Sequence, residues 1–336
     1  MNREWHDKIF SVTEKGFGQL ALDIFRFQYE DNTVYNSYVN ALGIKPSNVN
    51  EIGSIPFLPI SFFKTDNIKT GKFNAEVIFK SSGTSQTTRS QHHVKDVYTY
   101  IQSFSRAFER MYGELEEWCI LGLLPSYWEK GDSSLVYMVD SFIKQSGNPH
   151  SGFYLYDHDK LKDTLLFLER AGQKTILIGV TYALLDFAER FPVILKDTII
   201  METGGMKGRR EELTRMEVHE RLKQAFGKSE IHSEYGMTEL LSQAYAKKEG
   251  RFHCPPWMKV LIRDDEDPLS VHSPQSIVDS ENVTFTGAIN IIDLANIHSC
   301  SFIATDDVGK VYADRSFEVL GRMDGSDLRG CSLLTV

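Results

Sequence analysis

The middle of the chain alternates short apolar runs with amphipathic segments, and this alternation restricts the fold more than any other feature. Apolar side chains in the amphipathic segments recur at helical spacing, as Leu161, Leu165 and Leu168 do. The expected strands cover residues 174–178 and 198–201, and the expected helices cover residues 160–170, 182–190 and 209–226. Strands that alternate with helices predict an α/β fold, with a largely parallel sheet and helices on its faces.

The two ends of the chain follow different patterns. Apolar residues in the first 50 positions recur at helical spacing, which predicts helices there. After Lys247 the pattern changes to short β runs, which predict an antiparallel β subdomain. These runs are residues 258–262, 283–286, 289–292, 302–305, 310–312 and 317–320. We therefore expect an α/β core over residues 1–250, an antiparallel β subdomain of the same unit over 251–320, and a hinge remnant and tail over 321–336.

Composition restricts the partners and the compartment. A chain of 336 residues with 41% hydrophobic and 25% charged residues is an ordinary globular protein. Its formal charge of −9 and the lack of a basic stripe argue against a nucleic-acid partner. No apolar run approaches the length of a membrane span, and the first residues lack the apolar centre of a signal peptide. These features predict a cytoplasmic protein.

The four cysteines are spaced without a C-x-x-C pair, which indicates neither a zinc site nor a disulfide framework. They are Cys119, Cys254, Cys300 and Cys331. Cys119 lies in an apolar run and is predicted to belong to the core.

A hydroxyl-rich segment over residues 81–85 is a candidate phosphate-binding loop. Its residues are Ser81, Ser82, Gly83, Thr84 and Ser85. Hydroxyls and backbone N–H groups in such a turn can hold phosphate oxygens, and the glycine lets the backbone come close. The G-x-x-x-x-G-K-[ST] spacing is missing, which excludes a Walker-type loop. An ordinary Ser/Thr turn is the alternative.

A second candidate brings Tyr235, Thr238 and Glu239 within one turn of chain. Mg²⁺ uses one or two carboxylates together with substrate phosphates, so a single Glu is sufficient. Residues 231–234 resemble a short strand feeding a turn, which is the usual place for ligands in α/β sheets. The alternative is a helix start in which Thr238 and Glu239 complement the helix dipole.

Two further segments are candidate ligand contacts. Residues 202–205 end a predicted strand with Gly204 and Gly205, where a flat base can lie against the backbone. A tight strand-to-helix turn is also expected at these residues, and the two interpretations are compatible. Near the C-terminus, residues 305–309 read Thr-Asp-Asp-Val-Gly, and their alternative is a β-turn between strands.

In their order along the chain, segments 81–85, 235–239 and 321–324 resemble the adenylate-forming enzymes. This superfamily contains acyl-CoA synthetases, luciferases and peptide-synthetase adenylation domains. The resemblance implies the N-terminal-domain fold of these enzymes, the cofactors ATP and Mg²⁺, and activation of a carboxylic acid as acyl-AMP.

The same resemblance implies roles for individual residues. Residues 81–85 would hold phosphate, Arg89 would keep the positive charge of the family's loop, and Gln86 stands where the family has glycine. Thr238 would touch phosphate and Glu239 would hold Mg²⁺. The residues implied to hold the nucleoside are Gly204, Gly205, Tyr235, Asp307 and Arg322.

Within this group, Tyr235 would stack on adenine, and Asp307 would bind the ribose hydroxyls with help from Arg322. Asp306 replaces a family glycine. Asp324 aligns with the hinge that precedes a mobile lid in most members. Only residues 325–336 follow it, so the lid and its catalytic lysine are expected to be missing.

One branch resembles this arrangement, the acyl-protein synthetases of bacterial luminescence systems, the LuxE type. The runs that carry the likeness are residues 55–60 with 63–65, 124–128, 133–138, 254–258 and 329–332. The resemblance implies that a fatty acid is activated, moved to Cys331 and passed to an acyl-reductase or carrier-protein partner. A tail cysteine without a role is the alternative.

The acid pocket is nominated at Tyr127, Trp128, Gly179, Val180 and Thr181, although a Tyr-Trp pair is more often packing than pocket. Two other functions stay open. One is an acyl-CoA ligase whose lid comes from another chain, and the other is a catalytically weak nucleotide-binding protein.

Overall fold

A computed structural model describes residues 3–82, 88–125, 131–204, 213–264, 269–272 and 284–323. Contacts divide the chain into two compact units, each discontinuous in sequence. The first unit joins Met1–Phe104 with Thr238–Gln243 and the strands that follow His253. The second unit joins Ser105–Met237 with Ala244–Phe252. The continuous segments expected from the sequence, with boundaries at 250 and 320, remain a prediction about domain organisation.

The second unit contains the predicted α/β sheet. Its strands lie in the order β9-β8-β7-β6-β4-β5, and the pairs are parallel except for β8 with β9. The strands are β4 (Cys119–Leu123), β5 (Gly152–Phe153), β6 (Thr175–Val180), β7 (Ile199–Thr203), β8 (His232–Tyr235) and β9 (Ala244–Ala246). Every residue of β4 and β6 is buried, as expected for strands covered on both faces. Cys119 is fully buried in β4, so its predicted place in the core is confirmed.

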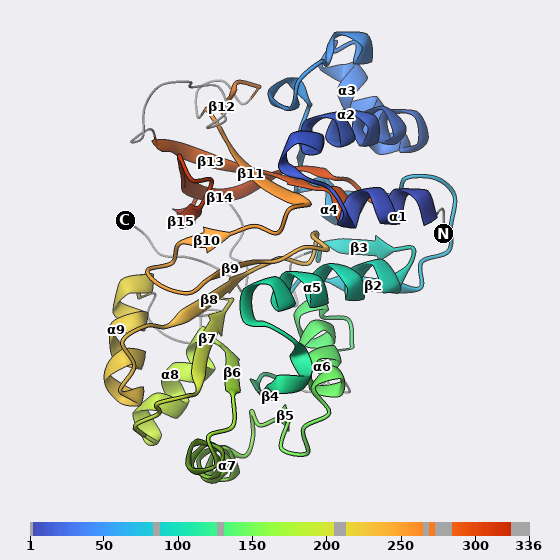
Figure 1. The fold of residues 1–336 in the computed structure, drawn as a ribbon. Helices are drawn as coiled ribbons and strands as arrows, with labels where there is room; N and C mark the ends of the chain where they lie inside the picture. Colours follow the sequence, from blue (N-terminus) through green and yellow to red (C-terminus); the bar gives the residue numbers. More distant parts are fainter. Residues whose placement is uncertain are drawn as a thin grey trace. The chain divides into compact units, whose positions relative to one another are not determined.

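Helices flank this sheet as the alternation predicts. They are α6 (Ser134–Ser146), α7 (His158–Ala171), α8 (Thr181–Arg190) and α9 (Arg215–Phe226). α8 packs against β6 and β7 and lies beside α9, whereas α6 packs against β4 (Figure 1). The helix expected over 209–226 begins only at Arg215, because Thr214 forms a capping box with Glu217; residues 209–212 lie outside the described part.

The first unit begins with helices, as predicted for the first 50 residues. These are α1 (Arg3–Phe10), α2 (Glu14–Asp31), α3 (Thr33–Ala41) and, further on, the short α4 (Phe62–Thr65). Gln28 ties α2 to the antiparallel part, since its Nε2 donates to the Ile297 carbonyl at 3.0 Å and its Oε1 accepts from the Ser301 N–H at 2.9 Å. A hairpin of β2 (Val77–Lys80) and β3 (Gln91–Val94) follows, and α5 (Val97–Tyr112) crosses the division between the units.

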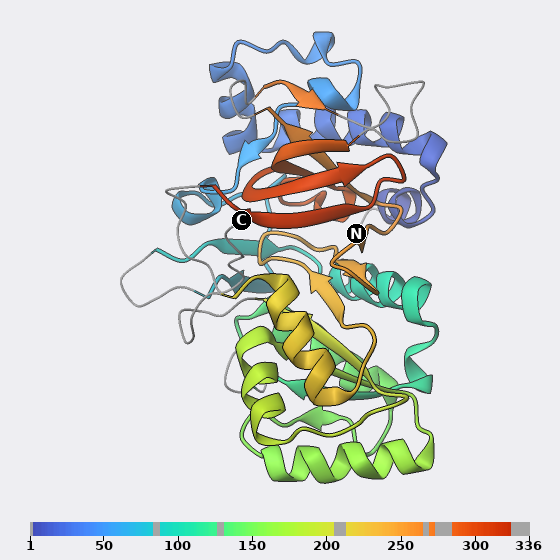
Figure 2. The ribbon, with the colours of Figure 1, turned by 90° about the vertical axis from the view of Figure 1, so that its left-hand side faces the viewer.

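The predicted antiparallel β subdomain is present in the first unit (Figure 2). Its strands lie in the order β12-β11-β13-β14-β15, and β1 (Leu58–Pro59) pairs with β14 in parallel. They are β11 (Met258–Arg263), β12 (Val271–His272), β13 (Thr284–Asp293), β14 (Phe302–Tyr312) and β15 (Phe317–Arg322); β10 (Phe252–His253) falls at the division between the units. Among the described residues, none of the helices combines the length and the apolar character that crossing a bilayer requires.

The structure corrects the boundaries of two strands. The runs at 283–286 and 289–292 form one strand, β13, and those at 302–305 and 310–312 form one strand, β14. Residues 305–309 are therefore not a turn between strands. They lie inside β14, where the register shifts between Val308 and Gly309. Such an irregularity bends a strand without ending it, which explains how a glycine and two aspartates fit there.

Gly309 is required by packing at this irregularity. A Cβ built on it would lie 2.5 Å from the Glu318 carbonyl oxygen and 2.5 Å from Ile289 Cδ1. We expect Gly309→Ala to lower the free energy of unfolding by about 1–3 kcal/mol, as overpacking does. Gly18→Ala in α2 is the control, because no atom lies within 4 Å of its Cβ position and it should stabilise the helix by about 0.5–1 kcal/mol. Equal urea midpoints for both variants would contradict this explanation.

Candidate functional site

Thr238 and Glu239 lie in a turn that belongs to the first unit, so the alternative of a helix start is wrong. The two carbonyl groups of this pair are each held by a side chain. His92 on β3 contacts the Thr238 carbonyl oxygen through Nδ1 at 2.8 Å. Asn296, in the 3₁₀ turn Leu294–Asn296, donates from Nδ2 to the Glu239 carbonyl at 2.7 Å. The Glu239 side chain itself is fully buried.

Asp293, at the end of β13, holds Leu241 and Ser242, which follow this turn. Its carboxylate accepts hydrogen bonds from the Leu241 N–H at 2.8 Å, the Ser242 N–H at 3.0 Å and the Ser242 hydroxyl at 2.6 Å. Burial raises the pKa of Asp293 to about 6, although these hydrogen bonds oppose the rise. Ser103 Oγ of α5 lies 3.0 Å from Ser242 Oγ and accepts from Trp257 Nε1 at 3.0 Å. The turn is therefore fixed by side chains from several elements of one unit.

His92 is neutral at pH 7. Burial lowers its pKa to about 4, and this effect exceeds the opposing influence of the Thr238 hydrogen bond and the Glu239 carboxylate. The sequence analysis missed His92, Asp293 and Asn296, because they are far from residue 238 in sequence and match no motif. The one available signal was a polar Gln-His-His run ahead of Val94, which is unusual in a strand that must bury a face.

The hairpin β2–β3 carries the candidate phosphate loop. Ser81 accepts from the Ser90 N–H at 2.9 Å through its hydroxyl. Arg89 donates from Nε to the Ser81 carbonyl at 2.5 Å and from Nη2 to the Lys80 carbonyl at 3.3 Å. Its guanidinium therefore stabilises the base of the hairpin, which the motif alone did not indicate. Ser82 is described, whereas Gly83, Thr84, Ser85 and Gln86 lie outside the described residues.

The structure brings Asp307 and Arg322 together, as the resemblance implied. They are cross-strand partners in β14 and β15, and Arg322 Nε lies 3.5 Å from Asp307 Oδ1. Asp306 makes the shorter contact, since its Oδ2 accepts from Arg322 Nη2 at 2.8 Å. The Arg322 side chain is 8% exposed, so its charge is buried beside two carboxylates. Asp324 and Cys331 lie outside the described residues.

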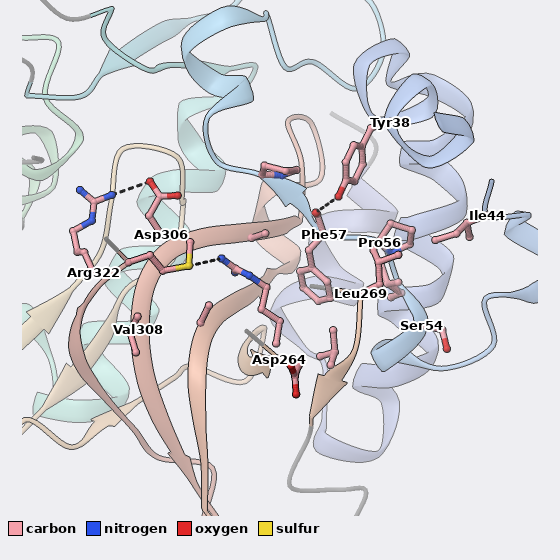
Figure 3. A pocket seen from close by; sticks show the side chains of 17 residues that line it. Tyr38, Ile44, Ser54, Pro56, Phe57, Asp264, Leu269, Asp306, Val308 and Arg322 are labelled. Atoms are coloured by element: carbon pink, nitrogen blue, oxygen red, sulfur yellow. Dashed lines mark hydrogen bonds and ion pairs between the residues drawn. The ribbon is translucent and has the colours of Figure 1, made fainter. Parts of the chain in front are cut away.

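A cavity of about 580 Å³ adjoins this ion pair in the first unit. Figure 3 shows Arg322 and Asp306 at one end of it and Tyr38, Pro56 and Phe57 at the other. Its volume is within the range of small-molecule pockets, which are mostly apolar with a few polar groups. The sequence analysis missed this pocket, because its walls come from the N-terminal helices and the β subdomain.

In the second unit, two buried carboxylates lie at the carboxyl ends of β7 and β8. Burial raises the pKa of Glu234 to about 7, and the charge of Glu202 adds to the rise, although the Thr203 hydroxyl donates a hydrogen bond to Glu234. Burial also acts to raise the pKa of Glu202. Here His219 at 3.5 Å and Arg215 at 3.4 Å outweigh it, so the pKa falls below its usual value. The pKa values of the two acids are therefore shifted in opposite directions.

The predicted adenine contacts lie beside these acids. Tyr235 is 9% exposed, and its ring lies 5.7 Å from that of Phe252. Gly204 has a φ of +69°, a backbone conformation that favours glycine, and its carbonyl accepts from the Thr181 hydroxyl at 3.1 Å. Gly205 lies outside the described residues.

The nominated acid pocket is only partly described. A Cβ on Gly179 would lie 2.9 Å from Leu123 Cβ and from Leu184 Cγ, so helix–sheet packing explains this glycine. Val180 and Thr181 are buried. Tyr127 and Trp128 lie outside the described residues. The role of these residues in acid binding remains a prediction.

The fold is that of the adenylate-forming enzymes. A luciferase-like enzyme from the mealworm Zophobas morio matches with 15% identity and a TM-score of 0.50, over 77% of this chain and 60% of its own. A double mutant of o-succinylbenzoate CoA synthetase from Bacillus subtilis, bound with a product analogue, matches with 16% identity and a TM-score of 0.52. The match covers 78% of this chain and 52% of the synthetase.

The same B. subtilis enzyme in complex with ATP and magnesium matches with 15% identity and a TM-score of 0.49. This match covers 76% of this chain and 53% of the enzyme. The chain thus spans between 52% and 60% of the length of these structures. No curated protein matches. The family model for "Acyl-protein synthetase, LuxE" matches residues 9–335, and this chain belongs to that family.

The raised pKa of Glu234 predicts a pH-dependent stability. Between the unfolded value of 4.5 and about 7, the folded protein binds one more proton here than the unfolded chain. Stability contributed by Glu234 therefore falls as pH rises through this window, by at most about 1.4 kcal/mol per pH unit.

We expect Glu234→Gln to remove this slope, so that the variant gains stability relative to the parent between pH 5 and pH 7. Urea unfolding at several pH values measures this pH dependence of the free energy of unfolding. Glu220→Gln, on the exposed side of α9, is the control and should keep the parent's slope. A slope for Glu234→Gln equal to that of the parent would show that this carboxyl does not titrate in that window.

Proposed function

We propose that this protein activates a fatty acid with ATP as acyl-AMP and then transfers the acyl group to the thiol of Cys331. The observation that carries the proposal is family membership over residues 9–335, a span that includes Thr238, Glu239, Arg322 and Cys331. In the first step, a carboxylate oxygen bonds to the α-phosphorus of ATP while the bond to pyrophosphate breaks. In the second step, the thiolate bonds to the acyl carbon while the bond to AMP breaks.

Mg²⁺ is the metal that the donor set near Thr238 fits. Mg²⁺ prefers oxygen ligands and uses one or two carboxylates, and Glu239 offers a carboxylate in a turn held by His92, Asn296 and Asp293. When bound, Mg²⁺ would neutralise charge on the phosphates. The chain's own part is to fix Glu239 and to place the Thr238 hydroxyl beside it. Ser81 and Ser82 begin the loop that we propose for the phosphates.

The nucleoside contacts are proposed residue by residue from the family resemblance. Asp307 would accept hydrogen bonds from the ribose hydroxyls, and Arg322 would hold Asp307 in place through the 3.5 Å contact. Tyr235 and Gly204 would contact adenine. Because Arg322 is buried beside Asp306 and Asp307, it is already oriented before a ligand arrives.

The acyl group is proposed to pass from Cys331 to an acyl-reductase or carrier-protein partner in the cytoplasm. The family description supports a protein acceptor. The formal charge of −9 supports a partner other than nucleic acid.

The test of the proposed function follows the acyl group. With ATP, Mg²⁺ and a fatty acid, we expect the protein to gain the mass of one acyl group, which hydroxylamine releases. Cys331→Ser should still form acyl-AMP and pyrophosphate but lose this mass, because a serine hydroxyl is not ionised as a thiol is. Cys254→Ser is the matched control and should keep it. Retention of the mass by Cys331→Ser, or rapid formation of acyl-CoA by the unacylated parent, would replace the proposal with the CoA ligase alternative.

A second prediction separates Asp307 from its neighbour. Asp307→Ala removes a hydrogen bond to a charged group, worth about 1.5–3 kcal/mol, so kcat/KM for ATP should fall by about 10- to 150-fold. Asp306→Ala loses the 2.8 Å contact with Arg322. Its kcat/KM for ATP should fall less than that of Asp307→Ala, because Asp307 remains. Pyrophosphate release measures both. A drop in melting temperature of Asp307→Ala with unchanged KM for ATP would make Asp307 a structural residue only.

A further inference from the structure

The backbone of Glu239 is held on both sides by side chains distant in sequence. The peptide before it is bonded through the Thr238 carbonyl to His92 at 2.8 Å, and the peptide after it through the Glu239 carbonyl to Asn296 at 2.7 Å. Each peptide group is planar, so restraining both groups restrains φ and ψ of the residue between them. The direction of the bond from Cα to Cβ of Glu239 is then restrained as well.

The His92 bond has a defined polarity. A backbone carbonyl oxygen can only accept, so Nδ1 must carry the proton of the neutral ring. The ring is 1% exposed and lies edge-on to Phe63 of α4, with ring centroids 6.0 Å apart. Turning the buried donor away from the Thr238 carbonyl would leave its N–H without this partner, which is costly.

His92 also connects two elements that the proposed function uses. It lies on β3 opposite Phe79 of β2, in the hairpin whose base Arg89 stabilises. Its acceptor, Thr238, precedes the carboxylate proposed for Mg²⁺. The strand after the candidate phosphate loop is thus bonded directly to the turn that carries Glu239, within one unit.

We propose that His92 is a positioning residue that aims the Glu239 carboxylate at the metal of the ATP complex by donating from Nδ1 to the Thr238 carbonyl. The inference rests on the proposed function and adds a residue to it. His92 touches neither substrate nor metal in this scheme. It acts through the peptide between Thr238 and Glu239, so its loss should weaken metal-dependent nucleotide binding and leave metal-free binding unchanged.

Two variants distinguish the hydrogen bond donated by Nδ1 from the effect of filling the same space with a side chain. In His92→Asn, the amide nitrogen takes the place of Nδ1 and can still donate to the carbonyl. In His92→Gln, the amide reaches the place of Nε2 and leaves the carbonyl without this donor. His93→Asn is the matched control, because His93 is the next residue on β3 and its Nε2 contacts Asn67 Oδ1 at 2.9 Å instead.

The first measurement is calorimetric titration with a non-hydrolysable ATP analogue, with and without Mg²⁺. The parent should bind more tightly with Mg²⁺. His92→Gln and His92→Ala should lose about tenfold of this gain, the equivalent of a 1.4 kcal/mol coupling, while His92→Asn and His93→Asn keep it. Full retention of the gain by His92→Gln and His92→Ala would overturn the positioning role and leave the proposed function standing.

The second measurement does not need a ligand. Hydrogen exchange of the segment that contains Glu239 should be faster in His92→Ala than in the parent and unchanged in His93→Asn. Equal exchange in His92→Ala and the parent would overturn the positioning role. A parent that binds no ATP analogue at all would overturn the proposed function, and with it the metal part of the inference.

Discussion

The buried carboxylate of Asp293 is the interaction on which the candidate site depends. It accepts from the Leu241 N–H, the Ser242 N–H and the Ser242 hydroxyl, all within 3.0 Å. The segment Thr238–Gln243 thereby belongs to the first unit, although the residues before and after it belong to the second. Hydrogen bonds to a buried charge are strong and costly to lose, so this short turn stays fixed without regular secondary structure.

Three of the buried acids among the described residues are held in different ways. Asp293 accepts backbone and hydroxyl donors. Glu202 faces Arg215 and His219, which lower its pKa despite burial. Glu234 has the Thr203 hydroxyl as a donor and a pKa raised to about 7 by burial. The charge partner decides the outcome, since burial acts in the same direction on all three.

Periodicity predicted the secondary structure well, because local packing and capping agreed with it. Helix α7 and strand β6 match their expected ranges within a few residues. The errors fall where a local signal conflicts with tertiary packing. Residues 305–309 have the composition of a turn, yet β13 and β15 on either side keep them in β14. The helix expected over 209–226 begins late, at Arg215, because the Thr214 hydroxyl caps the N-terminus of α9.

The sequence alone determined the α/β pattern, the antiparallel β subdomain and the family likeness, because periodicity and motif order are written in neighbouring residues. It also brought Asp307 and Arg322 to one candidate site. Only the tertiary structure decided that Arg89 binds its own hairpin and that His92 and Asn296 hold the peptides around Glu239. These contacts join residues as far as 146 positions apart. No local pattern encodes them, since they exist only once folding has buried polar groups that must find a partner.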